Sequence, residues 1–242
     1  MDKKYCIANW KMNMTLSDAI LYFNNFKINV LNNEKTMVIF CPPAVSIHGI
    51  KEIVCDTSIE IGAQNISFEE EGALTGEISG AMLEDLECRW VLVGHSERRQ
   101  IFKENNNLVF KKFKLSLSNG LTPILCIGET LEERKSNQTE KVLTDQLHKI
   151  ISTFHDKEFI VAYEPVWAIG TGISADLSII SSTHDMIKKI ISEYNDNIPI
   201  IYGGSVDQKN SKEIGSLPNV NGFLVGGASL DPDIFYKIYS NL

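Results

Sequence analysis

Eight short apolar runs, distributed along the whole chain, are the feature of this sequence that most constrains its fold. Most of them are separated by longer amphipathic stretches, such as residues 176–194, where apolar side chains recur at the spacing of one helical face. Strands and helices are therefore expected to alternate. The predicted strands lie at residues 5–10, 36–41, 59–64, 89–94, 121–127, 159–164, 199–203 and 221–226.

Apolar strands of this kind are typical of a parallel sheet, which needs a helical crossover between consecutive strands. Eight such units in 242 residues favour an α/β fold of the closed (β/α)8 barrel type, with eight parallel strands ringed by helices, over an open sheet. No linker rich in Pro, Gly or Ser divides the chain, so a single domain over residues 1–242 is expected. One long connection, residues 65–78, is rich in Glu, Gly and Thr, and loops of that length are often functional.

Charge and composition exclude several classes of partner. The net charge is -8 and the 23 Lys and Arg residues are scattered, which argues against binding to nucleic acid or to an anionic membrane. No apolar run approaches the roughly 18 residues of a membrane span, and the first residues do not resemble a signal peptide. The five cysteines contain no CxxC pair, so we expect a cytoplasmic protein with reduced, mostly buried thiols.

Active sites of (β/α)8 barrels lie at the carboxyl ends of the strands, which directs the search to eight places. Five of the predicted strands end in unusual residues. These are Asn9 and Lys11 after the first strand, residues 95–99 after the fourth, Glu164 after the sixth, residues 203–205 after the seventh and residues 226–229 after the eighth. We expect them to form one candidate site.

Glu164 ends a buried strand and is followed by a stiff segment with Pro165 and Trp167 that leads into a Gly-Thr-Gly sequence. A lone strand-end glutamate is more often a partner in a salt bridge. Here a loop able to cover the carboxylate would exclude water and raise its pKa toward that of a useful general base. We interpret Glu164 as the base.

His95 is followed by Ser96, which we expect to cap a helix, and by Glu97, which we expect in the first turn of that helix. A buried histidine satisfied by backbone is the ordinary interpretation, but a helix N-terminus disfavours a cation, and a neutral ring there can polarise a substrate oxygen. Lys11, beside Asn9, can supply fixed positive charge. Glu97 is either its ion partner or a helix-capping carboxylate. The other histidines are expected at the surface: His48, His148, His155 and His184.

The paired glycines after the seventh and eighth strands are either simple turns or a phosphate site built from backbone N–H groups, which barrels often form there. Ser205 adds a hydroxyl donor, Gly226 and Gly227 add backbone amides, and Gly170 from the segment after Glu164 can add another. The predicted ligand is a phosphate monoester.

Two other motifs fail on their context. Residues 170–175 match the dinucleotide fingerprint GxGxxA, but the acidic residue needed about 20 positions later would fall in a helix. Residues 94–98 approach the nucleophile motif GxSxG, but Arg98 stands where glycine is required. No HExxH motif or Cys/His cluster is present, so neither a metal nor a cofactor is expected.

Taken together, these blocks resemble the triosephosphate isomerase family, with the match running from residue 5 to about residue 239. The resemblance implies the cofactor-free interconversion of dihydroxyacetone phosphate and glyceraldehyde 3-phosphate, a step of glycolysis and gluconeogenesis. It makes Glu164 the base, with Asn9, Lys11 and His95 stabilising an enediolate and residues 165–172 closing as a lid.

The resemblance also implies a homodimer, in which Thr75, Gly76 and Glu77 reach a neighbouring subunit near Lys11 and His95. The chain departs from the family at residues 173–174, which are Ile-Ser where Lys-Thr is frequent, and at Leu74, where Phe is usual. These departures concern lid motion and dimer strength.

Two alternatives belong to other functional classes. A barrel that only binds phosphorylated metabolites would keep the glycine-rich loops without needing Glu164. Another sugar-phosphate isomerase or an aldolase would use a metal cluster or a Schiff-base lysine, for which Lys11 is the one obvious candidate. The combination of Glu164, His95 and Lys11 favours the isomerase.

Overall fold

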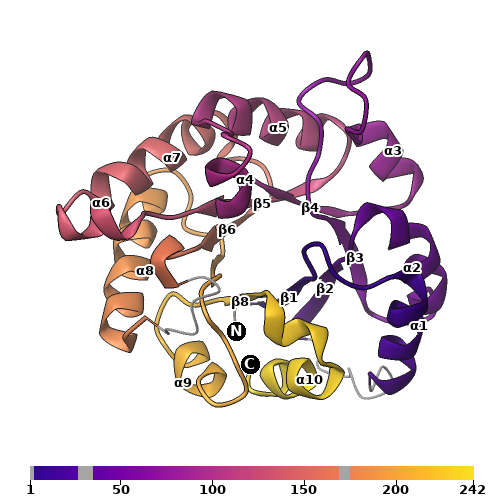
Figure 1. The fold of residues 1–242 in the computed structure, drawn as a ribbon. Helices are drawn as coiled ribbons and strands as arrows, with labels where there is room; N and C mark the ends of the chain where they lie inside the picture. The colour runs from indigo at the N-terminus through magenta and orange to yellow at the C-terminus, as the bar shows by residue number, and fades with distance from the viewer. Residues whose placement is uncertain (1–2, 27–34, 169–174) are drawn as a thin grey trace.

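The computed structural model describes residues 3–26, 35–168 and 175–242. Eight parallel strands pair in chain order and close into a barrel, with β1 paired to both β2 and β8, and helices surround it (Figure 1). This confirms the predicted (β/α)8 fold. The strands are β1 (Lys4–Asn9), β2 (Thr36–Cys41), β3 (Glu60–Ala63), β4 (Trp90–Val93), β5 (Thr122–Ile127), β6 (Ile160–Tyr163), β7 (Ile200–Tyr202) and β8 (Gly222–Val225).

The helices lie mostly on the outside of the barrel, and the stretch predicted at residues 176–194 forms α8. Asp176 caps that helix by accepting a hydrogen bond from the backbone N–H of Ser178. The helices are α1 (Leu16–Asn25), α2 (Ile47–Val54), α3 (Gly80–Asp85), α4 (Ser96–Gln100), α5 (Asn106–Ser118), α6 (Leu131–Lys135), α7 (Thr139–Phe154), α8 (Leu177–Ser192), α9 (Ser211–Gly215) and α10 (Pro232–Ser240), with 3-10 turns η2 (Ala44–Ser46), η3 (Val166–Ala168) and η4 (Gly227–Leu230).

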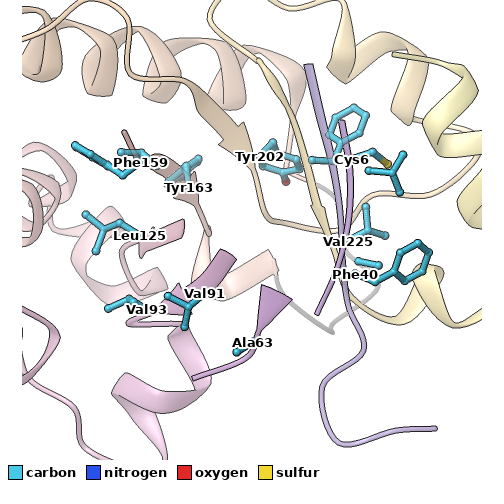
Figure 2. Close-up of a cluster of buried hydrophobic side chains, with 14 of the residues drawn as sticks. Cys6, Phe40, Ala63, Val91, Val93, Leu125, Phe159, Tyr163, Tyr202 and Val225 are labelled. Atoms are coloured by element: carbon cyan, nitrogen blue, oxygen red, sulfur yellow. The ribbon is translucent and has the colours of Figure 1, made fainter. Parts of the chain in front are cut away.

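Two apolar layers hold this arrangement together, because successive strand residues point to opposite faces of the sheet. Along β1, Tyr5 and Ile7 belong to the layer inside the barrel, whereas Cys6 and Ala8 belong to the layer between the strands and the helices. Figure 2 shows part of the second layer, with side chains from several neighbouring strands. The rigid barrel fixes the positions of the strand ends.

The burial of the cysteines and of His184 can be compared with what the sequence predicts. Cys6, Cys41, Cys88 and Cys126 are buried, as expected for cysteines within or beside apolar runs, while Cys55 is exposed. The prediction that His184 lies at the surface is wrong, because its position on α8 falls on the face that also carries Ile180 and Ile187. Its Nδ1 atom is 2.9 Å from the carbonyl oxygen of Asn219.

The connection between β3 and α3 projects from the barrel in Figure 1, and its Thr75 and Gly76 are exposed. Leu74 in this connection is half-buried, and the backbone N–H of Glu77 donates to the carbonyl oxygen of Leu74 at 3.0 Å. Within the described ranges, no helix is long and apolar enough to cross a membrane.

Candidate active site

A pocket of about 280 Å³ opens at the carboxyl ends of the strands and brings together most of the predicted site residues. Gly170 falls outside the described residues. Glu97 lines a neighbouring pocket that also contacts Lys11 and His95. The lining residues of the first pocket are Asn9, Lys11, His95, Glu164, Gly203, Gly204, Ser205, Val206, Leu224, Gly226, Gly227 and Ala228.

Glu164 immediately follows β6, and its side chain is 2% exposed. Its backbone N–H donates to the carbonyl oxygen of Ile127 at 2.7 Å, which continues the β5–β6 pairing by one more bond. Both carboxylate oxygens are engaged: Oε1 lies 2.9 Å from Nε2 of His95, and Oε2 accepts a hydrogen bond of 2.9 Å from the backbone N–H of Ser96. The carboxylate is therefore held against the first turn of α4.

The expectation of a raised pKa for Glu164 is wrong in this arrangement. Burial alone would raise the pKa of the carboxyl, but the His95 ring and the Ser96 N–H stabilise the carboxylate and hold the pKa below its usual value. Desolvation could be expected from the sequence, whereas the contacts of Glu164 with His95 and Ser96 could not. As a result, Glu164 is ionised and able to accept a proton.

His95 lies beyond the end of β4 and is itself the N-cap of α4, so the expectation that Ser96 caps this helix is wrong: Ser96 is the first residue of the helix. The backbone N–H of Glu97 donates to Nδ1 of His95 at 3.2 Å, so Nδ1 carries a lone pair and the proton of the neutral ring lies on Nε2. Burial lowers the pKa of His95, but the Glu164 carboxylate raises it, and the net direction is upward while the two groups touch. Separating them would leave burial as the main influence and favour the neutral ring.

Lys11 has a left-handed backbone with φ of 53°, which is unusual for a residue with a side chain. Its backbone N–H donates to Oδ1 of Asn9 at 3.1 Å, and its carbonyl oxygen accepts from Nε2 of Gln64 at 2.8 Å. The Lys11 Nζ atom lies 2.6 Å from Oε1 of Glu97, so the predicted ion pair between these side chains is present. Sequence reasoning missed Gln64, although it follows β3 at the same end of the barrel.

The glycines after β7 and β8 allow close approaches within the pocket. A Cβ atom at Gly203 would lie 3.0 Å from Cγ of Glu164, and one at Gly226 would lie 3.3 Å from Cε of Lys11. A Cβ at Gly227, the first residue of η4, would meet no atom within 4 Å. The backbone after β7 and the backbone after β8 therefore line the same pocket, together with Ser205.

A second buried carboxylate, Glu129, organises the segment that follows Glu164, and sequence reasoning missed it. Its Oε1 atom accepts hydrogen bonds from the hydroxyl of Tyr163 at 3.1 Å, from Nε1 of Trp167 at 3.2 Å and from Nη1 of Arg134 at 2.7 Å. The backbone N–H of Val166 donates to the carbonyl oxygen of Glu129 at 3.2 Å. Glu129 thus anchors η3 to the loop after β5.

Within the part of the chain that the structure describes, no group of three or more His, Cys, Asp or Glu side chains is placed to hold a metal ion. The arrangement instead offers a carboxylate, a histidine ring and an ammonium group around one polar space. These features define the class of the chain as a (β/α)8-barrel protein with a candidate acid–base site at the carboxyl ends of its strands.

Comparison with known proteins gives the family. The family model described as triosephosphate isomerase matches residues 4–242. The triosephosphate isomerase of Dictyoglomus turgidum is 42% identical over 98% of this chain and 99% of its own length. The triosephosphate isomerase of Dehalococcoides mccartyi is 44% identical over 96% of this chain and 93% of its own length. That of Aquifex aeolicus is 41% identical over 98% of this chain and 98% of its own length. The chain belongs to the triosephosphate isomerase family.

Proposed function

We propose that the pocket is the active site of a triosephosphate isomerase, which interconverts dihydroxyacetone phosphate and D-glyceraldehyde 3-phosphate through an enediolate without a cofactor. The observation that carries the proposal is the convergence of Glu164, His95, Lys11 and Asn9 on one pocket with the glycines after β7 and β8. Membership of the family agrees with this activity, which belongs to glycolysis and gluconeogenesis.

Glu164 would remove a proton from the carbon beside the substrate carbonyl and return it to the neighbouring carbon. Because both carboxylate oxygens are engaged by His95 and Ser96, the side chain must first leave the Ser96 N–H and turn toward the pocket. A glycine at position 203 favours such a movement, because a Cβ atom there would already lie 3.0 Å from Cγ of Glu164 and would crowd the side chain.

The negative charge that develops on the substrate oxygens would be stabilised by His95, Lys11 and Asn9. The neutral His95 ring would have its proton on Nε2, the atom that contacts Glu164, and could donate it to a substrate oxygen once Glu164 has turned away. Once Glu164 moves away, burial favours this neutral form. Lys11 would supply a fixed charge and Asn9 an amide donor. Glu97 would hold Lys11 in place through their ion pair.

The phosphate group would bind the backbone at Gly226 and Gly227 and the hydroxyl of Ser205. These residues line the same pocket as Glu164, and the open space over Gly227 can receive a tetrahedral anion. Gly170 would contribute another amide when residues 165–172 close over the substrate. Closure would exclude water from an intermediate that can otherwise lose its phosphate.

We further propose that residues 1–242 form one domain in the cytoplasm and that two chains form a homodimer through Thr75, Gly76 and Glu77. A pocket of about 350 Å³ beside Lys11 supports the dimer, since it can receive a loop from a second chain. Large apolar side chains around it are exposed, including Met12 at 96% and Phe102 at 63%. An exposed apolar surface of this kind is typical of a subunit interface.

An assay of purified protein with each triose phosphate, coupled to consumption of the product, tests the activity. Interconversion in both directions without added metal is expected. An absence of turnover would contradict the proposal. Borohydride added with substrate gives a second test, because covalent trapping at Lys11 would indicate an aldolase-like Schiff base instead.

A further inference from the structure

Arg99 connects the end of β4, which leads to His95, with the end of β5, which pairs with the strand before Glu164. This half-buried side chain of α4 makes three hydrogen bonds. Its Nε atom donates to the carbonyl oxygen of Gly94 at 2.7 Å, its Nη2 atom to the carbonyl oxygen of Cys126 at 3.2 Å and its Nη1 atom to Oδ1 of Asn106 at 2.7 Å. Neither Arg99 nor Asn106 lines the active-site pocket.

The two carbonyls belong to the position at which β4 and β5 separate. The last pair in their register is Val93 with Leu125, so Gly94 and Cys126 are the next residues on each strand. Gly94 has a left-handed φ of 72° and turns the chain away from β5 toward His95. The planar guanidinium of Arg99 spans the resulting opening and hydrogen-bonds both strands.

Each bridged strand is joined to one member of the proposed catalytic pair, β4 through the chain and β5 through a backbone hydrogen bond. Gly94 directly precedes His95, and the backbone N–H of Arg99 also donates to the carbonyl oxygen of His95 at 3.1 Å. One residue after Cys126, the carbonyl oxygen of Ile127 accepts the backbone N–H of Glu164. The positive charge of Arg99 also interacts with the Glu164 carboxylate.

We propose that Arg99 is a positioning residue for the isomerase reaction, which sets the separation of His95 and Glu164 by bridging the carbonyl groups of Gly94 and Cys126. It touches neither substrate nor the reacting atoms. Its planar group with several fixed donors is needed, because the ammonium of lysine is a single point donor that cannot span two strands and Asn106 together. The packing is close, since a Cβ atom on Gly94 would lie 2.9 Å from Nη2 of Arg99.

The test compares Arg99→Met, Arg99→Lys and Asn106→Ala with Arg89→Lys. Arg89 serves as the matched control because it immediately precedes β4, at the opposite end of the same strand, and its side chain is 71% exposed. We expect kcat to fall at least about tenfold in both Arg99 variants, with KM changing less than about threefold, because 1 Å misplacements alone lower rates by up to about 10². Asn106→Ala should give a smaller loss in the same direction, and Arg89→Lys none.

Two further measurements separate positioning from simple destabilisation. The constant for competitive inhibition by inorganic phosphate should be unchanged, since the proposed phosphate site lies in the segments that follow β7 and β8. The pKa of the His95 ring, followed by NMR, should fall in the Arg99 variants, because a displaced carboxylate no longer raises it. Should Arg99→Met fail to fold, Arg99→Lys and the exposed Asn106→Ala carry the test.

Wild-type kinetics in Arg99→Lys would overturn the inference, as would an equal loss of kcat and phosphate affinity with an unchanged His95 titration. The inference rests on the proposed function, and the two can fail separately. Absence of isomerase activity in the wild-type protein would remove the proposed function, whereas an active wild type with unaffected Arg99 variants would remove this inference alone.

Discussion

At the scale of the residue, His95 and Glu164 each change the proton affinity of the other. Their contact at 2.9 Å lowers the pKa of the Glu164 carboxyl, and in the proposed mechanism the same ring nitrogen of His95 serves a substrate oxygen. The backbone N–H groups of Ser96 and Glu97 complete this pair, and both come from the first turn of α4. The helix terminus therefore orients the proposed base and the proposed electrophile together.

Replacing Glu164 with Gln removes the proton acceptor and nearly preserves the size of the side chain. We expect kcat to fall by about 10² to 10⁴, the range for loss of a positioned general base. Glu158→Gln, at the opposite end of the same strand, is the matched control because Glu158 is exposed. Steady-state kinetics of both variants test the assignment, and near-normal turnover by Glu164→Gln would contradict it.

His184 makes stability depend on pH. Burial lowers its pKa from 6.5 to about 4, so the unfolded chain binds the proton first as pH falls. The stabilisation is complete above pH 6.5 and is lost as pH decreases, with about 2 kcal/mol lost at pH 5. The His184→Asn variant keeps an N–H donor for the carbonyl of Asn219 without titrating. Denaturant unfolding at pH 7.5 and pH 5 should show a smaller decrease for this variant than for wild type, and equal decreases would be inconsistent with this account.

At the scale of the element, periodicity and strand ends were enough to predict the barrel. All eight strands lie within the predicted runs or one residue outside them, because buried parallel strands need continuous apolar sequence. The candidate site could be located for the same reason, since side chains such as Lys11 and Glu164 follow strands. Glu129, Gln64 and the pKa of Glu164 could not be predicted, because each depends on contacts between distant segments.

The segment after Glu164 gives a prediction for one element. Deleting residues 169–172 shortens the proposed lid while leaving the anchor of Trp167 on Glu129 in place. Water should then reach the enediolate, and phosphate should leave it to give methylglyoxal. Measuring methylglyoxal and inorganic phosphate beside the isomerised product tests this expectation. Clean isomerisation by the shortened chain would count against a lid that excludes water.

At the scale of the whole molecule, the proposed homodimer depends on the loop between β3 and α3. Thr75→Arg places a long cation at an exposed position and leaves the barrel contacts unchanged. We expect this variant to sediment as a monomer and to lose activity, because Lys11 and His95 would lack the neighbouring loop. Ser152→Arg, on the exposed face of α7, is the matched control. A fully active dimer formed by Thr75→Arg would contradict the interface.

Four of the five cysteines are buried and one is exposed. Burial raises the pKa of Cys6, Cys41, Cys88 and Cys126, so these thiols react slowly, whereas Cys55 is exposed at the end of α2. A maleimide fluorophore should therefore attach at Cys55 alone in the native protein. The unmodified chain therefore offers a labelling position that does not line the active-site pocket, suited to energy-transfer measurements of exchange in the proposed homodimer.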